Sequence, residues 1–129
     1  MPRGHECVLV VDDEPSIVKI LSELLGQLGY QVLSTTSGTE ALRMVVQKKD
    51  QISLVIVDQS MPDLSGIDLA LKLRAIHPDM PIILYSGYDQ ETFRRQMREI
   101  GISAFMAKPV TRSELAMTVR KVLDAARKK

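Results

Sequence analysis

Residues 52–62 read ISLVIVDQSMP, and this stretch of sequence decides the fold. Its first six residues are almost all apolar, and such a run is typical of a strand that is buried on both faces of a parallel sheet. The run ends at Asp58, whose ionised carboxylate is costly to bury unless a partner uses the charge. The stretch therefore predicts a central strand that carries a functional carboxylate at its carboxyl end.

Residues 7–13, CVLVVDD, repeat this arrangement near the start of the chain. An apolar run again ends in acid, here the pair Asp12 and Asp13. If the two strands lie side by side, three carboxylates meet at one edge of the sheet. Because carboxylate oxygens are the ligands that a hard cation takes, this edge predicts a metal site at which Asp58 can also react.

Strand-like runs and helix-like segments alternate along the chain. We expect strands at 7–11, 31–35, 52–57, 81–85 and 102–107. Apolar residues at helical spacing follow each of them: from Pro15 to Gly29, from Ser37-Gly38 through Val46, from Gly66 to Pro78, from Gln90 to Ile100, and from the capping box of Thr111 and Glu114 to Ala126. Five strand–helix units in a row predict an open α/β domain with a parallel sheet and right-handed crossovers.

Length and composition narrow the class of protein. The 129 residues, 45% of them hydrophobic, suffice for one domain, with a tail at 1–6 and a core at about 7–125. The net charge of +1 indicates no nucleic-acid-binding surface. The single cysteine, Cys7, excludes an internal disulfide framework and fits a reducing, cytoplasmic setting. No apolar stretch approaches the ~20 residues of a membrane span, and no signal-peptide pattern opens the chain.

Five polar residues fall at the carboxyl ends of expected strands. Asp12 and Asp13 follow the first strand, Asp58 the third, Ser86 the fourth and Lys108 the fifth. Ligands of open α/β sheets bind beyond this edge. Mg²⁺ would offset the repulsion among the carboxylates, while an ammonium and a hydroxyl would hold phosphoryl oxygens. Together these residues predict a site for phosphoryl transfer onto a carboxylate.

Four motifs, in this order, connect the chain to a known family. They are VVDDE at 10–14, VDQSMPDLSG at 57–66, YSG at 85–87 and KP at 108–109. On these motifs the chain resembles a response-regulator receiver domain of two-component signalling, over about residues 7–125. The resemblance implies a doubly wound, flavodoxin-like fold, with five helices around a five-stranded parallel sheet of order 2-1-3-4-5.

The resemblance also implies a role for each residue of the site. Asp58 is expected to accept the phosphoryl group, and Lys108 is expected to bind its oxygens. Asp12 and Asp13 are expected to hold Mg²⁺ together with Asp58 and the backbone carbonyl of Ser60, with Asp13 as the more direct ligand of the acidic pair. No organic cofactor is expected.

Ser86 and Phe105 match the switch residues of the family. Ser86 is also expected to act as a catalytic residue alongside Asp58 and Lys108. The family often has tyrosine where this chain has Phe105, so a switch bond through that hydroxyl is absent here. The peptide bond between Lys108 and Pro109 is expected to be cis.

The function that this resemblance implies is a phosphoacceptor switch. A phosphohistidine on a histidine kinase or phosphotransfer protein would donate to Asp58. The domain would catalyse its own phosphorylation and dephosphorylation rather than act as a conventional enzyme. The helix at 90–100, the strand at 102–107 and the last helix would then present a changed face to an output domain or a second receiver, with no direct contact to nucleic acid. Sequence at 4–13, 29–30, 36–42 and 58–62 is similar to receivers within hybrid sensor histidine kinases, which indicates a module of that kind.

Plainer interpretations of the same residues stay open. Asp13 could cap the helix that begins at Pro15, and Ser86 could cap the helix that follows it. Lys108 could be a solvated charge, and Phe105 could be a core residue with no switching role.

Two other functions stay open as well. A magnesium-dependent phosphohydrolase also uses an aspartyl nucleophile, although Asp58 lacks the second carboxylate, two residues on, that such enzymes carry. A receiver-like interaction module would no longer take phosphate, although the complete acidic pair and Lys108 speak against it.

Overall fold

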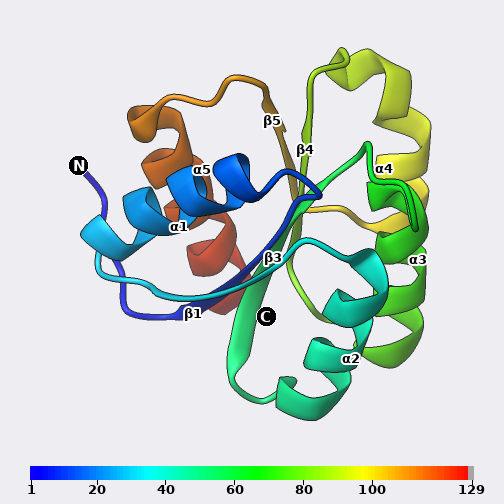
Figure 1. The fold of residues 1–129 in the computed structure, drawn as a ribbon, viewed down its shortest axis with the longest axis horizontal. Helices are drawn as coiled ribbons and strands as arrows, with labels where there is room; N and C mark the ends of the chain where they lie inside the picture. The colour runs from blue at the N-terminus through cyan, green and yellow to red at the C-terminus, as the bar shows by residue number, and fades with distance from the viewer. Residues whose placement is uncertain (128–129) are drawn as a thin grey trace.

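Five parallel strands form one sheet in the order β2-β1-β3-β4-β5, which is the order that the resemblance implied (Figure 1). The computed structural model describes residues 1–127. The strands are β1 (Cys7–Val11), β2 (Gln31–Thr35), β3 (Ile52–Asp58), β4 (Ile82–Ser86) and β5 (Ala104–Ala107). The helices are α1 (Pro15–Gln27), α2 (Gly38–Lys48), α3 (Gly66–Ile76), α4 (Arg94–Ile100) and α5 (Arg112–Arg127), and a 3₁₀ turn, η1 (Gln90–Phe93), leads into α4.

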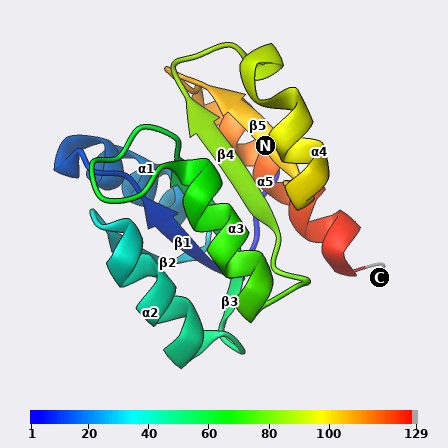
Figure 2. The same ribbon diagram turned by 90° about the vertical axis from the view of Figure 1, so that its right-hand side faces the viewer.

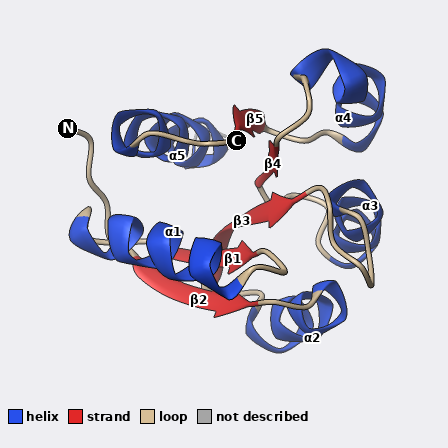
Figure 3. Ribbon diagram, turned by 45° about the horizontal axis from the view of Figure 1, so that its top comes forward, coloured by secondary structure: helices blue, strands red, loops and turns tan. Residues whose placement is uncertain are grey.

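Helices cover both faces of the sheet, as expected for a doubly wound fold. α1 and α5 lie on one face, and α2, α3 and α4 lie on the other (Figure 3). Side chains of β3 enter the two cores in alternation: Leu54 and Ile56 pack with α1 and α5, while Val55 and Val57 pack with the other three helices. This confirms that the central strand is buried on both faces. Within residues 1–127, no helix combines the length and apolar character that crossing a membrane requires.

All the strands run in the same direction, and this positions the site. Each neighbouring pair in the sheet is parallel. The arrowheads of β1, β4 and β5 in Figure 2 accordingly point toward one edge. The loops that leave the carboxyl ends of the strands therefore gather at that edge, where the unusual polar residues were expected.

Several element boundaries differ from expectation by one or two residues. β3 runs one residue further, through Asp58, whose backbone pairs with Tyr85 on β4. β4 shifts by one residue in the same direction. β5 begins two residues later than expected, because the N–H of Ile102 donates to the carbonyl of Met97 at the end of α4 (2.9 Å). The helix expected at 90–100 opens with η1, since 3₁₀ turns are frequent where helices start.

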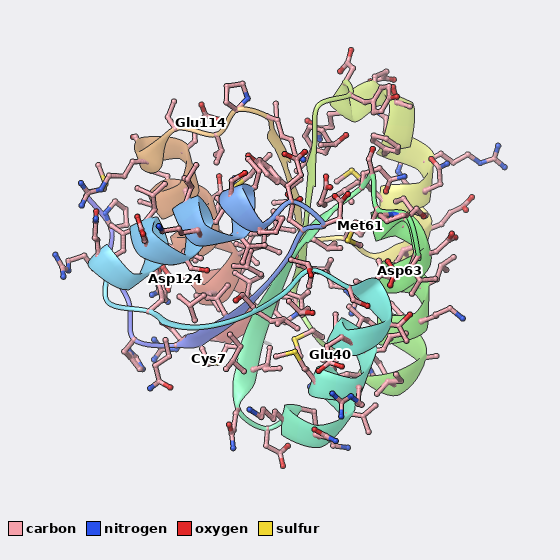
Figure 4. The ribbon with its side chains drawn as sticks, viewed as in Figure 1. Cys7, Glu40, Met61, Asp63, Glu114 and Asp124 are labelled. Carbon is pink, nitrogen blue, oxygen red and sulfur yellow. The ribbon has the colours of Figure 1, made fainter. Side chains whose placement is uncertain are left out.

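Helix caps follow the sequence signals. The Ser37 hydroxyl accepts a hydrogen bond from the N–H of Glu40 at the start of α2 (3.2 Å). The Thr111 hydroxyl accepts one from the N–H of Glu114 at the start of α5 (3.1 Å), where Figure 4 labels the glutamate. These bonds satisfy backbone donors that the first turn of a helix leaves free.

The residues before β1, which the sequence suggested as a tail, lie against the body of the domain. The N–H of Gly4 donates to the carbonyl of Leu28, just after α1 (3.0 Å). The guanidinium of Arg120 on α5 binds both carboxylate oxygens of Glu6, at 3.1 and 2.7 Å. Arg120 also donates to the carbonyl of Arg3 (3.2 Å), so this segment is held between α1 and α5.

Candidate functional site

The parallel sheet brings the three predicted carboxylates together. β1 and β3 are neighbours, with Val11 paired to Val57, so Asp12 and Asp13 leave the sheet beside Asp58. One carboxylate oxygen of each aspartate lies within 4.8 Å of the other two. Asp12 and Asp58 are buried, whereas Asp13 is half-buried and is the member of the cluster that reaches solvent.

Lys108 directly follows β5, and its side chain lies beside the carboxylates of the cluster. Its Nζ lies 2.9 Å from Oδ1 of Asp58 and 3.5 Å from Oδ2 of Asp12. It also lies 4.9 Å from the centre of the Tyr85 ring, within the range of a cation–π contact. The peptide bond between Lys108 and Pro109 is cis, as expected. The ammonium therefore stands between two carboxylates and an aromatic ring.

The charges of this site do not balance. Three carboxylates and one ammonium sum to −3 + 1 = −2 when all are ionised. Burial raises the pKa of Asp58, although Lys108 and the backbone N–H of Ser60 act in the opposite direction. Burial also raises the pKa of Asp12, against the effect of the Glu14 N–H. The described residues therefore leave negative charge uncompensated.

Lys108 nevertheless stays protonated. Burial lowers the pKa of its ammonium, but the hydrogen bond to Asp58 and the charge of Asp12 outweigh burial, and the net shift is upward. A permanently charged lysine at this position can hold an anionic oxygen as a point charge.

A hard divalent cation fits this arrangement. Oδ2 of Asp12 is buried and accepts no hydrogen bond from any residue in the described part of the chain, although it lies within ion-pair distance of the Nζ of Lys108, at 3.5 Å. A buried carboxylate oxygen without a partner is costly. Mg²⁺ takes oxygen ligands, and its two positive charges match the two uncompensated negative ones. The triad of Asp12, Asp13 and Asp58 thus offers the ligand type, the charge and the free oxygen that such a site needs.

Ser86 ends β4 with its side chain buried. Its hydroxyl accepts a hydrogen bond from the N–H of Tyr88 (3.0 Å). The cap of η1 is Asp89, whose carboxylate accepts from the N–H of Glu91 (3.2 Å). In this structure Ser86 therefore holds the loop that follows β4, and it does not cap the next helix.

Phe105 lies on β5, away from the carboxylates and toward α4. Its ring stacks on Phe93 of η1, with ring centres 6.4 Å apart and an angle of 29° between the planes. The ring of Tyr88 packs edge-on against the ring of Phe93, with ring centres 6.4 Å apart and an angle of 81° between the planes. Three aromatic side chains thus connect the loop after Ser86 with β5.

The loop between β3 and α3 carries Ser60, and it is anchored next to Asp58. The carbonyl of Gln59 accepts from the N–H of Gly66 and its side chain accepts from the N–H of Ile67, both at 2.9 Å. A Cβ at Gly66 would lie 2.7 Å from the carbonyl oxygen of Asp58, so glycine is what allows α3 to start this close to the site.

Three residues near the site were not predicted from the sequence. Tyr85 lies under Lys108, Gln59 ties the loop to α3, and Asp63 ties the same loop to α2. The apolar run at 81–85 predicts Tyr85 as a strand residue but gives no sign of the lysine above its ring. For Asp63 the only signal in the sequence is an acidic residue in a loop, which is too common to indicate a contact.

A family model described as the response regulator receiver domain matches residues 8–120. Among solved structures, the chain is similar to a response regulator receiver domain protein from Clostridium thermocellum, with a TM-score of 0.88 and 32% identity. That similarity covers 95% of this chain and 97% of the other.

Curated relatives carry more sequence than this chain. The probable transcriptional regulator ycf27 of Porphyra purpurea is 38% identical over 128 residues, which are 99% of this chain and 51% of the relative. The sensor kinase CckA of Brucella abortus is 33% identical over 121 residues, which are 94% of this chain and 13% of the relative. The chain thus spans about half the length of the first relative and a small part of the second.

Proposed function

The chain belongs to the response regulator receiver family, and from this we propose that it is a phosphoacceptor switch. In this proposal Asp58 takes a phosphoryl group from a phosphohistidine with Mg²⁺ present. The observation that carries it is the joint placement of the acidic triad and the Nζ of Lys108, 2.9 Å from Asp58. A nucleophilic carboxylate, oxygen ligands for a dication and a fixed ammonium are what phosphoryl transfer requires.

The residues of the site would divide the chemistry between them. Asp12, Asp13, Asp58 and the backbone carbonyl of Ser60 would hold Mg²⁺, which when bound neutralises charge on phosphoryl oxygens. A carboxylate oxygen of Asp58 forms the new O–P bond as the N–P bond of the phosphohistidine breaks, and the imidazole nitrogen keeps the electron pair. The ammonium of Lys108 exchanges its contact with Asp58 for one with a phosphoryl oxygen.

Ser86 and Phe105 would convert this event into a change of shape. Movement of the Ser86 hydroxyl toward a phosphoryl oxygen would release the N–H of Tyr88, which it binds at 3.0 Å without phosphate. The loop after β4 would then move, and Phe105 would leave its contact with Phe93 and turn inward. The face made by α4, β5 and α5 would change as a result.

The donor chemistry defines the partners. A histidine kinase or a histidine phosphotransfer protein would dock at the carboxyl edge of the sheet and α1, and a second receiver or an output domain would bind the face of α4, β5 and α5. The sensor kinase among the relatives supports the further proposal that the chain is a module of a hybrid kinase. The single cysteine fits a reducing, cytoplasmic setting for such a module.

The two rival functions have less support. A phosphohydrolase of the aspartyl type carries a second carboxylate where this chain has Ser60. Turnover of a phosphate ester by catalytic amounts of protein would support the phosphohydrolase hypothesis. An interaction module that takes no phosphate has no need of the ammonium of Lys108 beside Asp58.

Reaction with acetyl phosphate tests the proposal. With Mg²⁺, the intact mass of the protein should rise by one phosphoryl group, and EDTA should prevent the rise. Asp58→Asn should stay unlabelled. An unchanged mass for the unaltered chain, or equal labelling of Asp58→Asn, would contradict a phosphoacceptor function.

A further inference from the structure

The loop that would supply the Ser60 carbonyl has little backbone support of its own. Among the described residues, the stretch 60–64 makes no backbone-to-backbone hydrogen bond. Two apolar side chains, Met61 and Leu64, pack against the core beneath it. Figure 4 labels Met61 and Asp63 on this loop, with Glu40 on α2 below them. The position of the loop therefore depends on side-chain contacts.

Asp63 is the polar anchor of this loop. Its Oδ2 accepts from the Ser37 hydroxyl (2.9 Å), from the N–H of Thr39 (3.1 Å) and from the Thr39 hydroxyl (3.3 Å). Its Oδ1 accepts from the N–H groups of Gly38 (3.3 Å) and Leu64 (3.0 Å). One carboxylate thus joins the loop between β3 and α3 to the first turn of α2.

The main role of this carboxylate is not an ion pair. Within residues 1–127, Asp63 has no basic side chain within ion-pair distance. The N–H of Thr39 is the main reason that its pKa falls from 3.8 to about 2, with the Ser37 hydroxyl adding to the effect. The carboxylate consequently stays ionised, and the anchor stays in place, throughout the neutral pH range.

Gly38 permits this contact. A Cβ at Gly38 would lie 3.0 Å from Cβ of Leu64 and 3.5 Å from Oδ1 of Asp63. The first of these distances is tighter than ordinary packing, so any side chain at this position would push the loop away from α2 by a few tenths of an ångström. The loop and α2 therefore depend on both residues: Asp63 supplies the hydrogen bonds between them, and Gly38 leaves the space for their close approach.

A displacement at Asp63 would reach Ser60 through a stiff link. The two residues between them are Met61 and Pro62. The proline ring fixes its own φ, and it also restricts the residue before it. Ser60 is in turn only two residues from Asp58, so the same movement would disturb the oxygen ligands at the centre of the site.

We propose that Asp63 is a positioning residue of the metal site: by holding the loop between β3 and α3 against α2, it sets the place of the Ser60 carbonyl and with it the affinity for Mg²⁺. This inference rests on the proposed function. Asp63 itself would contact neither the ion nor the phosphoryl group, and it would act only through the position of Ser60.

Calorimetric titration of the phosphate-free chain with MgCl₂ tests this role. Asp63→Ala removes all the anchoring bonds, and we expect it to weaken Mg²⁺ binding about 3- to 10-fold, less than the roughly 10- to 100-fold typical of residues that bond directly to metal ligands. Gly38→Ala keeps every carboxylate and places a good helix former in α2, and it should weaken binding in the same direction. Asp63→Asn keeps one acceptor oxygen and should recover part of the affinity.

A matched control separates positioning from general loss of stability. Glu6→Gln breaks a polar contact at the opposite edge of the sheet, and it should leave Mg²⁺ affinity within about 1.5-fold of the unaltered chain, because distant sites behave independently.

The failures of the two proposals are distinguishable. If the unaltered chain takes up no Mg²⁺, the proposed function fails and this inference fails with it. If the unaltered chain binds Mg²⁺ and both Asp63→Ala and Gly38→Ala bind it equally well, only the role of Asp63 is overturned. Weakening by Glu6→Gln to the same extent would also overturn it.

Discussion

Lys108 and Asp58 form an ion pair, 2.9 Å from Nζ to Oδ1, that joins the ends of two strands which are not neighbours in the sheet. The lysine reaches past β4 and lies over the ring of Tyr85 on the way. This pair compensates part of the charge of the acidic cluster, and it occupies the place where a phosphoryl group would be accepted.

Removal of the lysine should separate metal binding from chemistry. Lys108→Ala takes the formal charge of the cluster from −2 to −3. Mg²⁺ should then bind more tightly, by about 1 kcal/mol or roughly 5-fold. Phosphorylation by acetyl phosphate should nevertheless slow by about 10²-fold, because a preorganised cation is lost. Calorimetry and intact-mass time courses measure the two effects, and weaker Mg²⁺ binding by the variant would contradict the charge argument.

The acidic cluster should destabilise the metal-free domain at neutral pH. Burial raises the pKa of Asp12 and Asp58 above 3.8, so folding favours their protonated forms. The stability gained from protonation is present at low pH and is lost as pH rises through the raised values. In EDTA, the free energy of unfolding should therefore increase as pH falls from 7 toward those values. Urea titrations at several pH values check this, and Mg²⁺ should remove the increase.

Neutralising one carboxylate should reproduce that effect at constant pH. Asp12→Asn should stabilise the metal-free fold at pH 7 by about 1–2 kcal/mol, because it removes a buried charge whose Oδ2 accepts no hydrogen bond from the described residues, while Oδ1 can keep its bond from the N–H of Glu14. The same variant should lose most of its affinity for Mg²⁺. A metal-free Asp12→Asn protein that is less stable than the unaltered chain would show that the buried oxygen carries no such cost.

The contact between the first residues and α5 should give the opposite pH dependence. The guanidinium of Arg120 lowers the pKa of Glu6 from 4.5 to about 2. Its contribution to stability is therefore complete above pH 4.5 and is lost as pH falls to about 2. Glu6→Gln should lower the free energy of unfolding by about 1–3 kcal/mol at pH 7 and should reduce the loss of stability at acid pH. Glu23→Gln, at an exposed position on α1, is the control and should change neither.

The buried hydroxyl of Ser86 should matter for the switch more than for phosphate uptake. Ser86→Ala leaves the N–H of Tyr88 without its acceptor, at a cost of about 1 kcal/mol. Asp58 should still be phosphorylated, with its ligands intact. Amide chemical shifts of α4, β5 and α5 should move less on phosphorylation than in the unaltered chain. If phosphorylation changed the amide chemical shifts equally in the two proteins, Ser86 would have no part in the switch.

The centre of the site could be predicted from the sequence because one geometric rule governs it. The carboxyl ends of parallel strands meet at one edge, so an acidic residue after each of two apolar runs places Asp12 and Asp58 at that edge, and they come together because β1 and β3 are neighbours. Lys108 follows from the same rule. The order of the strands did not follow from periodicity, and it was the resemblance to receivers that implied it.

The contacts that fix the surroundings could not be predicted in this way. Asp63 and Ser37 are 26 residues apart, and Glu6 and Arg120 are 114 apart. Both contacts join polar side chains of loops or helix surfaces, where no repeating pattern marks a partner. These contacts depend on how α2 and α5 pack on the sheet. The hydrophobic pattern shows which face of each helix packs there, but not the exact position of the helix.

Mapping the phosphoryl group along the chain is the most direct test of the account. After reaction with acetyl phosphate and Mg²⁺, borohydride reduction converts an aspartyl phosphate to homoserine, which peptide mass spectrometry locates. We expect homoserine at position 58 alone and none in a sample treated with EDTA. Homoserine at position 12 or 13, or an unmodified chain, would contradict the role of Asp58 as the phosphoacceptor.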